Sequence, residues 1–229
     1  MKRFYQAAAI VPLAEGFGIA LDGKSVRTPG KALLAVPGEA LAGAIADEWN
    51  RQGEKIDPRS MPLTGLANAA IDRVAPDKEA FGQGLAAYGE SDLLCYRAEG
   101  PAPLVRRQEA HWDPILAWAR RRYDIDFECV AGIMHRPQSP NTIDQLRQAV
   151  LARSPFELAG LSNLVTISGS LLIALALAEQ AIGLDQAWSA AALDDQWQAE
   201  QWGEDDEAVK ALAARHADFA AASRFLALL

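Results

Sequence analysis

The sequence contains few cysteines, and their spacing matches no common cysteine motif. Cys95 and Cys129 are the two cysteines in a chain of 229 residues. They provide neither a disulfide framework nor the repeated C-x-x-C pattern of many zinc sites. This cysteine content is typical of proteins in a reducing compartment.

Nucleotide-binding and hydrolase motifs are also missing. No glycine-rich loop ends in Gly-Lys-Ser or Gly-Lys-Thr, and no G-x-G-x-x-G follows a predicted strand. The segment ISGSLL lacks the G-x-S-x-G nucleophile elbow. Its Gly169 and Ser170 lie in an apolar stretch, where close helix packing explains small residues better than catalysis does. The motifs therefore support neither nucleotide binding nor serine hydrolase chemistry.

Histidines are few, and they do not have the spacing of metal ligands. Glu109 and Asp113 share one helical face while His111 points to another, so a surface salt-bridge cluster explains them better than a zinc site. Cys95 and His135 could act as nucleophile and base only if the fold brought them together. We therefore expect no metal and no other cofactor.

Acidic residues outnumber basic ones, 30 to 22, which gives a net charge of -8. Binding to nucleic acid or to anionic membranes needs an excess of Lys and Arg, so we expect neither kind of partner. The N-terminal segment MKRFYQAAAIVPL has a basic start and an apolar run. Gln6 and Pro12 interrupt that run and Glu15 follows it, so we predict a first strand and no export.

The longest uncharged run, 21 residues between Glu157 and Glu179, predicts a buried helix at the core of the C-terminal part. Its length would allow a membrane span, and a membrane-associated protein is one alternative. The polar residues of its first half and the glutamates on both flanks disfavour that alternative. Ser154 and Pro155 predict where the helix starts, and Gly183 predicts its end.

The first sixty residues alternate short β-like runs with turn residues. Asp22-Gly23 lies between two such runs and predicts a β-hairpin, and Thr28–Lys31 predicts the next reversal. A helix is predicted over residues 37–52, with Leu41, Ile45 and Trp49 on one stripe that would cover the sheet.

The rest of the chain is dominated by helical patterns. Amphipathic helices are predicted in residues 61–74, 77–88, 101–123, 140–153, 185–198 and 205–229, and Pro114 should kink or split the long one. The sequence therefore predicts an α+β fold. A small antiparallel β-rich N-terminal domain with a covering helix would span residues 1–58. A larger α-helical domain, built around the buried central helix, would span residues 59–229.

The segment from Asp194 to Glu207, DDQWQAEQWGEDDE, stands apart from the other helical patterns. It contains seven acidic residues, no basic residue and two tryptophans. A solvated acidic face explains such a run, and so does a recognition surface on which aromatic residues bind and charges steer a partner. The residues alone leave both interpretations open. A partner at this surface would present a basic or partly apolar face.

Several longer segments together resemble one known family. They are KRFYQ, LDGKSVRTPGKALLAVP, LAGAIADEWNRQGEKIDPRSMPLTGLANAAIDRV, YGESDLLCYRAEGPAPLVRRQEAHWDPILAW and QWGEDDEA. In this combination they resemble the ATP-twelve family of chaperones, which assemble the catalytic head of the rotary ATP synthase by holding its free alpha subunit. The resemblance spans nearly the whole chain.

The resemblance implies an ATP-independent chaperone, not an enzyme, with the fold predicted above. Such a protein would bind the alpha subunit where the beta subunit later binds, prevent aggregation and leave when beta arrives. It implies a cytoplasmic protein, or one of the mitochondrial matrix in organellar relatives, and we expect a monomer. Partner-binding residues of the family map to Asp195, Gln196, Trp202, Gly203, Asp206 and Glu207. Asp194-Asp195-Gln196 stands where the family pattern predicts a glutamate.

The competing interpretation is a small-molecule-binding protein or an enzyme. Its site would lie in a cleft between the β-rich and helical parts and would use His111, Cys95 or His135. A bound metabolite or metal in the purified protein would favour it.

Overall fold

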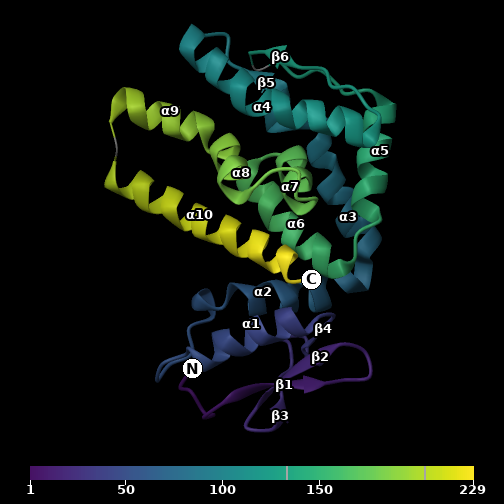
Figure 1. Ribbon diagram of the computed structural model, residues 1–229, viewed down its shortest axis with the longest axis vertical. Coiled ribbons are helices and arrows are strands. Elements are labelled where there is room, and N and C mark those ends of the chain that lie inside the picture. Colours follow the sequence, from purple (N-terminus) through teal and green to yellow (C-terminus); the bar gives the residue numbers. More distant parts are fainter. Residues whose placement is uncertain (133, 204) are drawn as a thin grey trace. The chain divides into compact units, whose positions relative to one another are not determined.

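The computed structural model describes residues 1–132, 134–203 and 205–229 (Figure 1). The chain forms two compact units. The first combines Met1–Lys78, Ser154–Gly160 and Arg224–Leu229, and the second combines Glu79–Arg153 and Leu161–Ser223. The division between residues 58 and 59 stays a prediction about domains. The compact units group the chain differently, because residues 59–78 and two later segments belong with the sheet.

The first unit contains a small antiparallel sheet, as predicted. Its strands are β1 (Ala8–Pro12), β2 (Phe17–Leu21), β3 (Lys24–Ser25) and β4 (Ala35–Val36). The strand β2 pairs with β1 along its whole length, and its two ends pair with β3 and β4. Leu21 pairs with Lys24, and Asp22 and Gly23 between them have φ of 47° and 82°. The predicted Asp22-Gly23 hairpin is therefore confirmed.

Helix α1 (Glu39–Asn50) covers this sheet, with Leu41 and Ile45 fully buried. It also holds the start of α2 (Pro62–Ala69). Glu48 of α1 is only 4% exposed, and its carboxylate accepts hydrogen bonds from the backbone N–H groups of Leu63 and Thr64, both at 2.8 Å. These N–H groups lie in the first turn of α2 and have no partner within that helix, so Glu48 caps it.

Beyond α2 the chain continues through a π turn, Ala70–Val74. In this turn the Asp72 carboxylate accepts hydrogen bonds from Thr28 Oγ1 and Gly30 N, both at 2.7 Å. The predicted reversal at Thr28–Lys31 is confirmed, because Lys31 N donates to Thr28 O at 2.9 Å. Asp72 therefore joins the Thr28–Lys31 reversal to the helical part of the same unit.

The rest of the chain is mostly helical, which confirms the α+β class. Its helices are α3 (Lys78–Ala86), α4 (Ala102–Tyr123), α5 (Pro140–Leu151), α6 (Pro155–Ser168), α7 (Leu171–Ala178), α8 (Leu184–Ala191), α9 (Leu193–Trp202) and α10 (Asp206–Ala227). Two short strands, β5 (Tyr96–Arg97) and β6 (Val130–Ala131), pair in parallel. We call this pair the β5–β6 ribbon.

The predicted central helix is broken, so its continuity was wrong. It starts as expected: Ser154 and Glu157 exchange hydrogen bonds at the first turn of α6. It ends at Gly169, whose φ is 68°, and Ser170 then begins α7 by accepting a hydrogen bond from Ile173 N at 3.0 Å. A serine that caps a new helix stops the old one. Gly183 likewise precedes α8 and does not end the central segment.

Two further helix predictions need correction. Of the two effects predicted for Pro114, the split is wrong, because α4 runs unbroken for 22 residues, and the kink stays a prediction. Trp112, Ile115 and Leu116 around Pro114 are buried, and this packing holds the turn together despite the hydrogen bond that proline removes. The single helix predicted over residues 185–198 is instead two helices, α8 and α9, that meet at Ala192.

Helix α7 forms the core of the second unit, and every residue from Leu171 to Leu177 is buried. It packs against α4 and α8. The Trp112 indole N–H of α4 donates to Ala190 O of α8 at 2.9 Å, so this buried polar group is satisfied. Among the described residues, no helix combines the length and the apolar character needed to cross a membrane.

Candidate partner-binding surface

Helices α9 and α10 run in opposite directions and meet at an exposed turn in the second unit (Figure 1). Helix α9 ends at Trp202, Gly203 follows with φ of 88°, and α10 begins at Asp206. Trp202 is 79% exposed, and Val209 in the second turn of α10 is 44% exposed. Large apolar side chains on a surface mark a candidate interaction site. Glu204 of the acidic segment lies outside the described residues.

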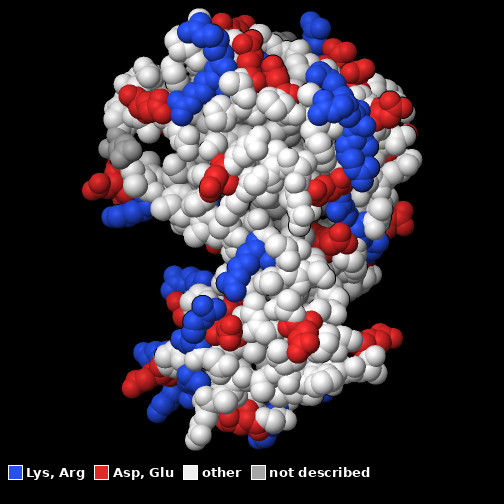
Figure 2. Space-filling view, in the orientation of Figure 1, with Lys and Arg blue, Asp and Glu red and all other residues white. Residues whose placement is uncertain are grey.

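A pocket of about 660 Å³ opens between α9 and α10, with Trp188 of α8 at its base. We call it the hairpin pocket. Figure 2 shows the hollow beside the connection between the two helices. Its apolar lining comes from Trp188, Trp202, Val209, Leu212 and several alanines, and its charged or polar lining from Asp195, Asp205, Arg215 and His216.

The base of the hairpin pocket is held by aromatic packing and an ion pair. The Trp188 ring lies 4.8 Å from the His216 ring and 5.6 Å from the ring of Phe219, which is fully buried. Arg215 of α10 donates to Asp195 Oδ2 of α9 at 2.7 Å and to the backbone oxygen of Ile167 at 3.2 Å. These contacts join α10 to α9 and α6.

A second pocket, of about 640 Å³, lies on the other side of α9. We call it the ribbon pocket, because Tyr96, Arg97 and Gly132 of the β5–β6 ribbon and its flank line it, together with Leu104, Trp197 and Trp202. Trp202 lines both pockets. The end of α9 is therefore a ridge that carries an exposed tryptophan between two hollows.

The acidic residues of this surface fall into two groups. On α9, Asp194 accepts from Gln108 Nε2 at 2.9 Å, Asp195 pairs with Arg215, and Glu200 accepts twice from Arg107 Nη1 at 2.7 and 2.8 Å. At the start of α10, Asp205, Asp206 and Glu207 are exposed. Among the described residues, none of these three makes an ion pair. The unpaired negative charge therefore lies at the α9–α10 turn.

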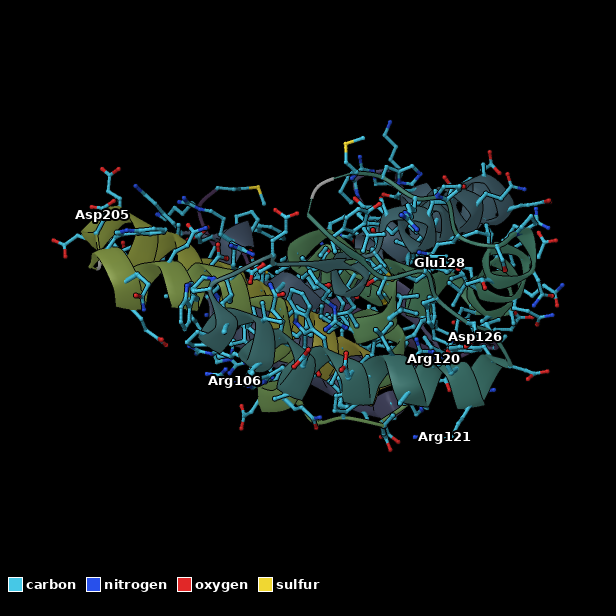
Figure 3. The ribbon with its side chains drawn as sticks, turned by 90° about the horizontal axis from the view of Figure 1, so that it is seen from above. Arg106, Arg120, Arg121, Asp126, Glu128 and Asp205 are labelled. Carbon is cyan, nitrogen blue, oxygen red and sulfur yellow. The ribbon has the colours of Figure 1, made fainter. Side chains whose placement is uncertain are left out.

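The arginines of α4 fall into ion-paired and exposed residues. Arg107 pairs with Glu200, Arg120 with Asp126 and Arg122 with Glu179. Arg106 and Arg121 are exposed. In Figure 3, Arg120 and Arg121 lie toward one end of the unit, and Asp205 lies at the opposite end. These five arginines of α4 are therefore either exposed or ion-paired.

The structure brings together some of the residues that the sequence singled out. Asp195, Trp202 and Gly203 line the hairpin pocket. Gln196 lines neither of the two pockets, and its backbone N–H continues α9 by donating to Ala192 O. Asp206 and Glu207 occupy the first turn of α10, where the helix dipole favours acidic side chains.

The wall that α10 contributes to the hairpin pocket was not predicted from the sequence. Asp205, Val209, Leu212 and His216 are spaced by four, three and four residues, so they follow one helical face. This spacing is visible in the sequence and could have been used. Trp188 of the hairpin pocket comes from α8, and much of the ribbon pocket comes from residues near position 97. No local sequence pattern predicts that these residues lie beside α9.

The residues of the competing enzyme interpretation have other partners. Cys95 is buried, and His135 Nδ1 shares a hydrogen bond of 2.8 Å with the Tyr96 hydroxyl. Asp113, which lies near His111 in sequence, pairs with Arg97 at 2.7 Å. Among the described residues, no three His, Cys, Asp or Glu side chains form a group that could hold a metal ion.

Comparison with known proteins identifies the family. The family model of the ATP12 chaperone protein matches residues 2–120. The mitochondrial protein atp12 of Schizosaccharomyces pombe is 24% identical over 202 residues, which are 83% of this chain and 69% of that protein. The crystal structure of Atp12 from Paracoccus denitrificans is 41% identical and matches with a TM-score of 0.94, over 99% of this chain and 97% of that chain.

A third relative supports the same assignment. The Atu1473 protein of Agrobacterium tumefaciens is 42% identical and matches with a TM-score of 0.95, over 99% of this chain and 85% of that chain. The chain therefore belongs to the ATP12 chaperone family, whose members assist the assembly of the ATP synthase.

Proposed function

We propose that this chaperone binds the free alpha subunit of the ATP synthase catalytic head. It would shield the alpha surface that the beta subunit later covers, prevent aggregation, and leave when beta binds. It would do so without ATP hydrolysis or any other catalysis. We place the contact at Trp202, Gly203, Asp206 and Glu207 of the α9–α10 turn, and at Asp195 and Gln196 in the first turn of α9.

The observation that carries this proposal is the 79% exposure of Trp202 between two pockets. A tryptophan buries a large area when it binds, and leaving it in water is unfavourable. Tryptophans dominate binding energies at protein interfaces, particularly where pockets around them receive side chains of the partner. A free subunit that must later join a complex exposes apolar surface of its own, so the two surfaces suit one another.

Charge around Trp202 supports a reversible contact. Asp205, Asp206 and Glu207 are exposed beside it, and they would attract a partner surface that is locally basic. Exposed charges mainly raise the rate of association and contribute little to final affinity. A chaperone that captures quickly and is displaced by a larger apolar interface needs this combination.

The first test is co-expression with the ATP synthase alpha subunit in the absence of beta. We expect alpha to become soluble, to co-elute with this chain in size-exclusion chromatography, and to be released when beta is added. Insoluble alpha and no complex would refute the proposed partner.

A matched pair of variants tests the contact. Trp202→Ala should weaken the alpha complex at least about tenfold, because an interface tryptophan contributes about 2 kcal/mol or more. Met134→Ala is the control: Met134 is 78% exposed, lines neither pocket, and belongs to the same unit. Equal affinities of the two variants would remove the α9–α10 turn from the interface.

Charge reversal tests the steering role separately. The double variant Asp206→Lys and Glu207→Lys should slow association with alpha and reduce the dependence of that rate on salt. Asp195→Lys is made alone, because it also breaks the pair with Arg215. Glu90→Lys with Glu128→Lys is the control of equal charge, and Glu128 lies far from Asp205 in Figure 3. Unchanged kinetics in the first variant would contradict steering by the turn.

A further inference from the structure

The two cysteines lie side by side, although 34 positions separate them in the sequence. The β5–β6 ribbon is parallel, with Tyr96 paired to Val130 and Arg97 to Ala131. The hydrogen bond from Gly132 N to Arg97 O, at 2.9 Å, continues the same register. Cys95 directly precedes Tyr96, and Cys129 directly precedes Val130. Each cysteine therefore directly precedes its strand, and the two lie at matching positions next to the first pair of the ribbon.

This register places the sulfur atoms within reach of a covalent bond. Neighbouring strands lie about 4.8 Å apart. A disulfide needs Cα atoms about 4.4 to 6.8 Å apart with side chains that point toward one another. Residues at matching positions of neighbouring strands direct their side chains to the same face, so the Cys95 and Cys129 side chains lie next to one another. The register thus brings the two thiols within the range in which a disulfide can form.

The surroundings give the two thiols different reactivities. Cys129 is exposed, and its pKa falls to about 6, first because of the neighbouring Cys95 thiol and further because of the positive charges of Arg97 and Arg120, while desolvation and the charge of Asp113 oppose the shift. Cys95 is buried, and the neighbouring Cys129 thiol, desolvation and the charge of Asp92 raise its pKa. Arg97 is fixed beside them, because it pairs with Asp113 and lies over the Trp112 ring.

We propose that Cys95 and Cys129 form a redox-active dithiol that a small-molecule disulfide converts into an intramolecular disulfide across the start of the β5–β6 ribbon. The Cys129 thiolate attacks the small disulfide, forms a mixed disulfide and releases one thiolate. Cys95 then loses its proton and attacks the Cys129 sulfur, which releases the second thiol. Two protein thiols are oxidised by two electrons, and one small disulfide is reduced to two thiols.

An exposed thiolate next to a buried resolving thiol is the arrangement of redox-sensitive cysteines. The new bond would join the two strands at one wall of the ribbon pocket, because Tyr96, Arg97 and Gly132 belong to that wall. Oxidation would therefore restrict the ribbon next to Trp197 and Trp202. This thiol chemistry does not depend on the identity of the partner.

The test treats the purified full-length chain with oxidised glutathione near neutral pH, blocks free thiols by alkylation, and measures the intact mass. The wild type should lose two hydrogens, accept no alkyl group and carry no glutathione. Dithiothreitol should restore two alkylated cysteines. A wild type that keeps both free thiols, or that forms dimers linked by disulfides, would overturn the proposal.

Single-cysteine variants separate the two steps. Cys95→Ala and Cys95→Ser should both accumulate a stable glutathione adduct on Cys129, because the resolving thiol is gone. Cys129→Ser should form neither product on the same time scale, because Cys95 is buried. Far-UV circular dichroism checks that each variant is folded. Two replacements of Cys95 are made so that the test still works if one of them does not fold. A stable adduct on the wild type, equal to that of the Cys95 variants, would show that Cys95 does not resolve it and would overturn the proposal.

Discussion

Two breaks between helices in the second unit use the same backbone device in opposite surroundings. Gly169 between α6 and α7, and Gly203 between α9 and α10, have φ of 68° and 88°. Apart from the glycine itself and its chain neighbours, no heavy atom of the described residues lies within 4 Å of the position that a Cβ would take at either glycine. Ser168 and Ser170 beside the first glycine are 4% and 0% exposed, whereas Trp202 beside the second is 79% exposed.

The difference lies in what satisfies the polar groups that each break exposes. At the buried break, Asp92 accepts hydrogen bonds from Ser170 Oγ at 2.7 Å and from Leu172 N at 3.0 Å, so a distant segment closes the gap. At the exposed break, water can satisfy the helix ends, and acidic side chains occupy the first turn of α10. The first break therefore builds the core, and the second leaves a surface available for a partner.

The largest effect that distinguishes the breaks should come from removing Asp92. Asp92→Ala leaves Ser170 Oγ, Leu172 N and Leu94 N buried without an acceptor, and we expect the free energy of unfolding to fall by about 4 kcal/mol. Asp206→Ala at the exposed break should change it by less than about 0.5 kcal/mol. Urea unfolding measures both. Similar losses would show that the two breaks are equally important for stability.

The buried break should also make stability depend on pH. Burial raises the pKa of Asp92 from 3.8 to about 6, although hydrogen bonds from Ser170, Leu172 and Leu94 oppose the shift. The folded state therefore binds the proton more tightly than the unfolded state. As pH rises from 3.8 to about 6, the contribution of Asp92 to the free energy of unfolding should fall, by at most about 1.4 kcal/mol per pH unit.

Asp92→Asn is the control for this pH dependence. Asparagine keeps an oxygen that can accept from Leu94 N and Ser170 Oγ but cannot titrate. The difference in free energy of unfolding between wild type and variant should therefore change between pH 4 and pH 6, the window set by the two pKa values, and stay constant above it. A constant difference across that window would show that burial does not shift the pKa.

Local chemistry explains which parts of the fold could be predicted. The Asp22-Gly23 turn and the buried Leu41 and Ile45 of α1 depend on residues close in sequence, and both predictions were confirmed. The break at Gly169 was missed because its neighbours form a long uncharged run. The residue that stabilises the break, Asp92, lies 78 positions before Ser170. A contact between separated residues also connects two short motifs of the family resemblance, because Glu48 of DEW caps the helix that starts in MPLT.

The candidate site shows the same limit. Acidic residues and tryptophans made the segment from Asp194 to Glu207 conspicuous, and the family resemblance pointed to the same place. The sequence could not show that Arg107 and Arg215 neutralise Glu200 and Asp195, which leaves the unpaired charge at the turn. It also could not show that Cys95 and Cys129 are neighbours, because strand register is a long-range property.

Substituting Gly169 and Gly203 compares the two breaks directly, with smaller expected losses of stability than Asp92→Ala. An alanine with a left-handed backbone is strained by about 1 to 2 kcal/mol. We expect Gly169→Ala to lose about that much stability, because buried hydrogen bonds on both sides fix its conformation. Gly203→Ala should lose less than about 1 kcal/mol, because the exposed turn can relax. Urea unfolding measures both variants, and Gly53→Ala, at an exposed glycine of the other unit, is the control. A larger loss of stability for Gly203→Ala than for Gly169→Ala would refute the comparison.

The smallest effect concerns the ion pair that joins α9 to α10. Arg215→Met removes the pair with Asp195, whose side chain is 49% exposed, as well as the hydrogen bond to Ile167 O. Partly exposed pairs contribute less than about 1 kcal/mol, and salt weakens them. Arg107→Met, which removes the pair with Glu200 on the opposite side of α9, is the matched control. Both variants should lose little stability, and the loss should shrink in high salt. A loss above about 2 kcal/mol for Arg215→Met would mean that the exposed break is held as tightly as the buried one, because only desolvated pairs reach that size.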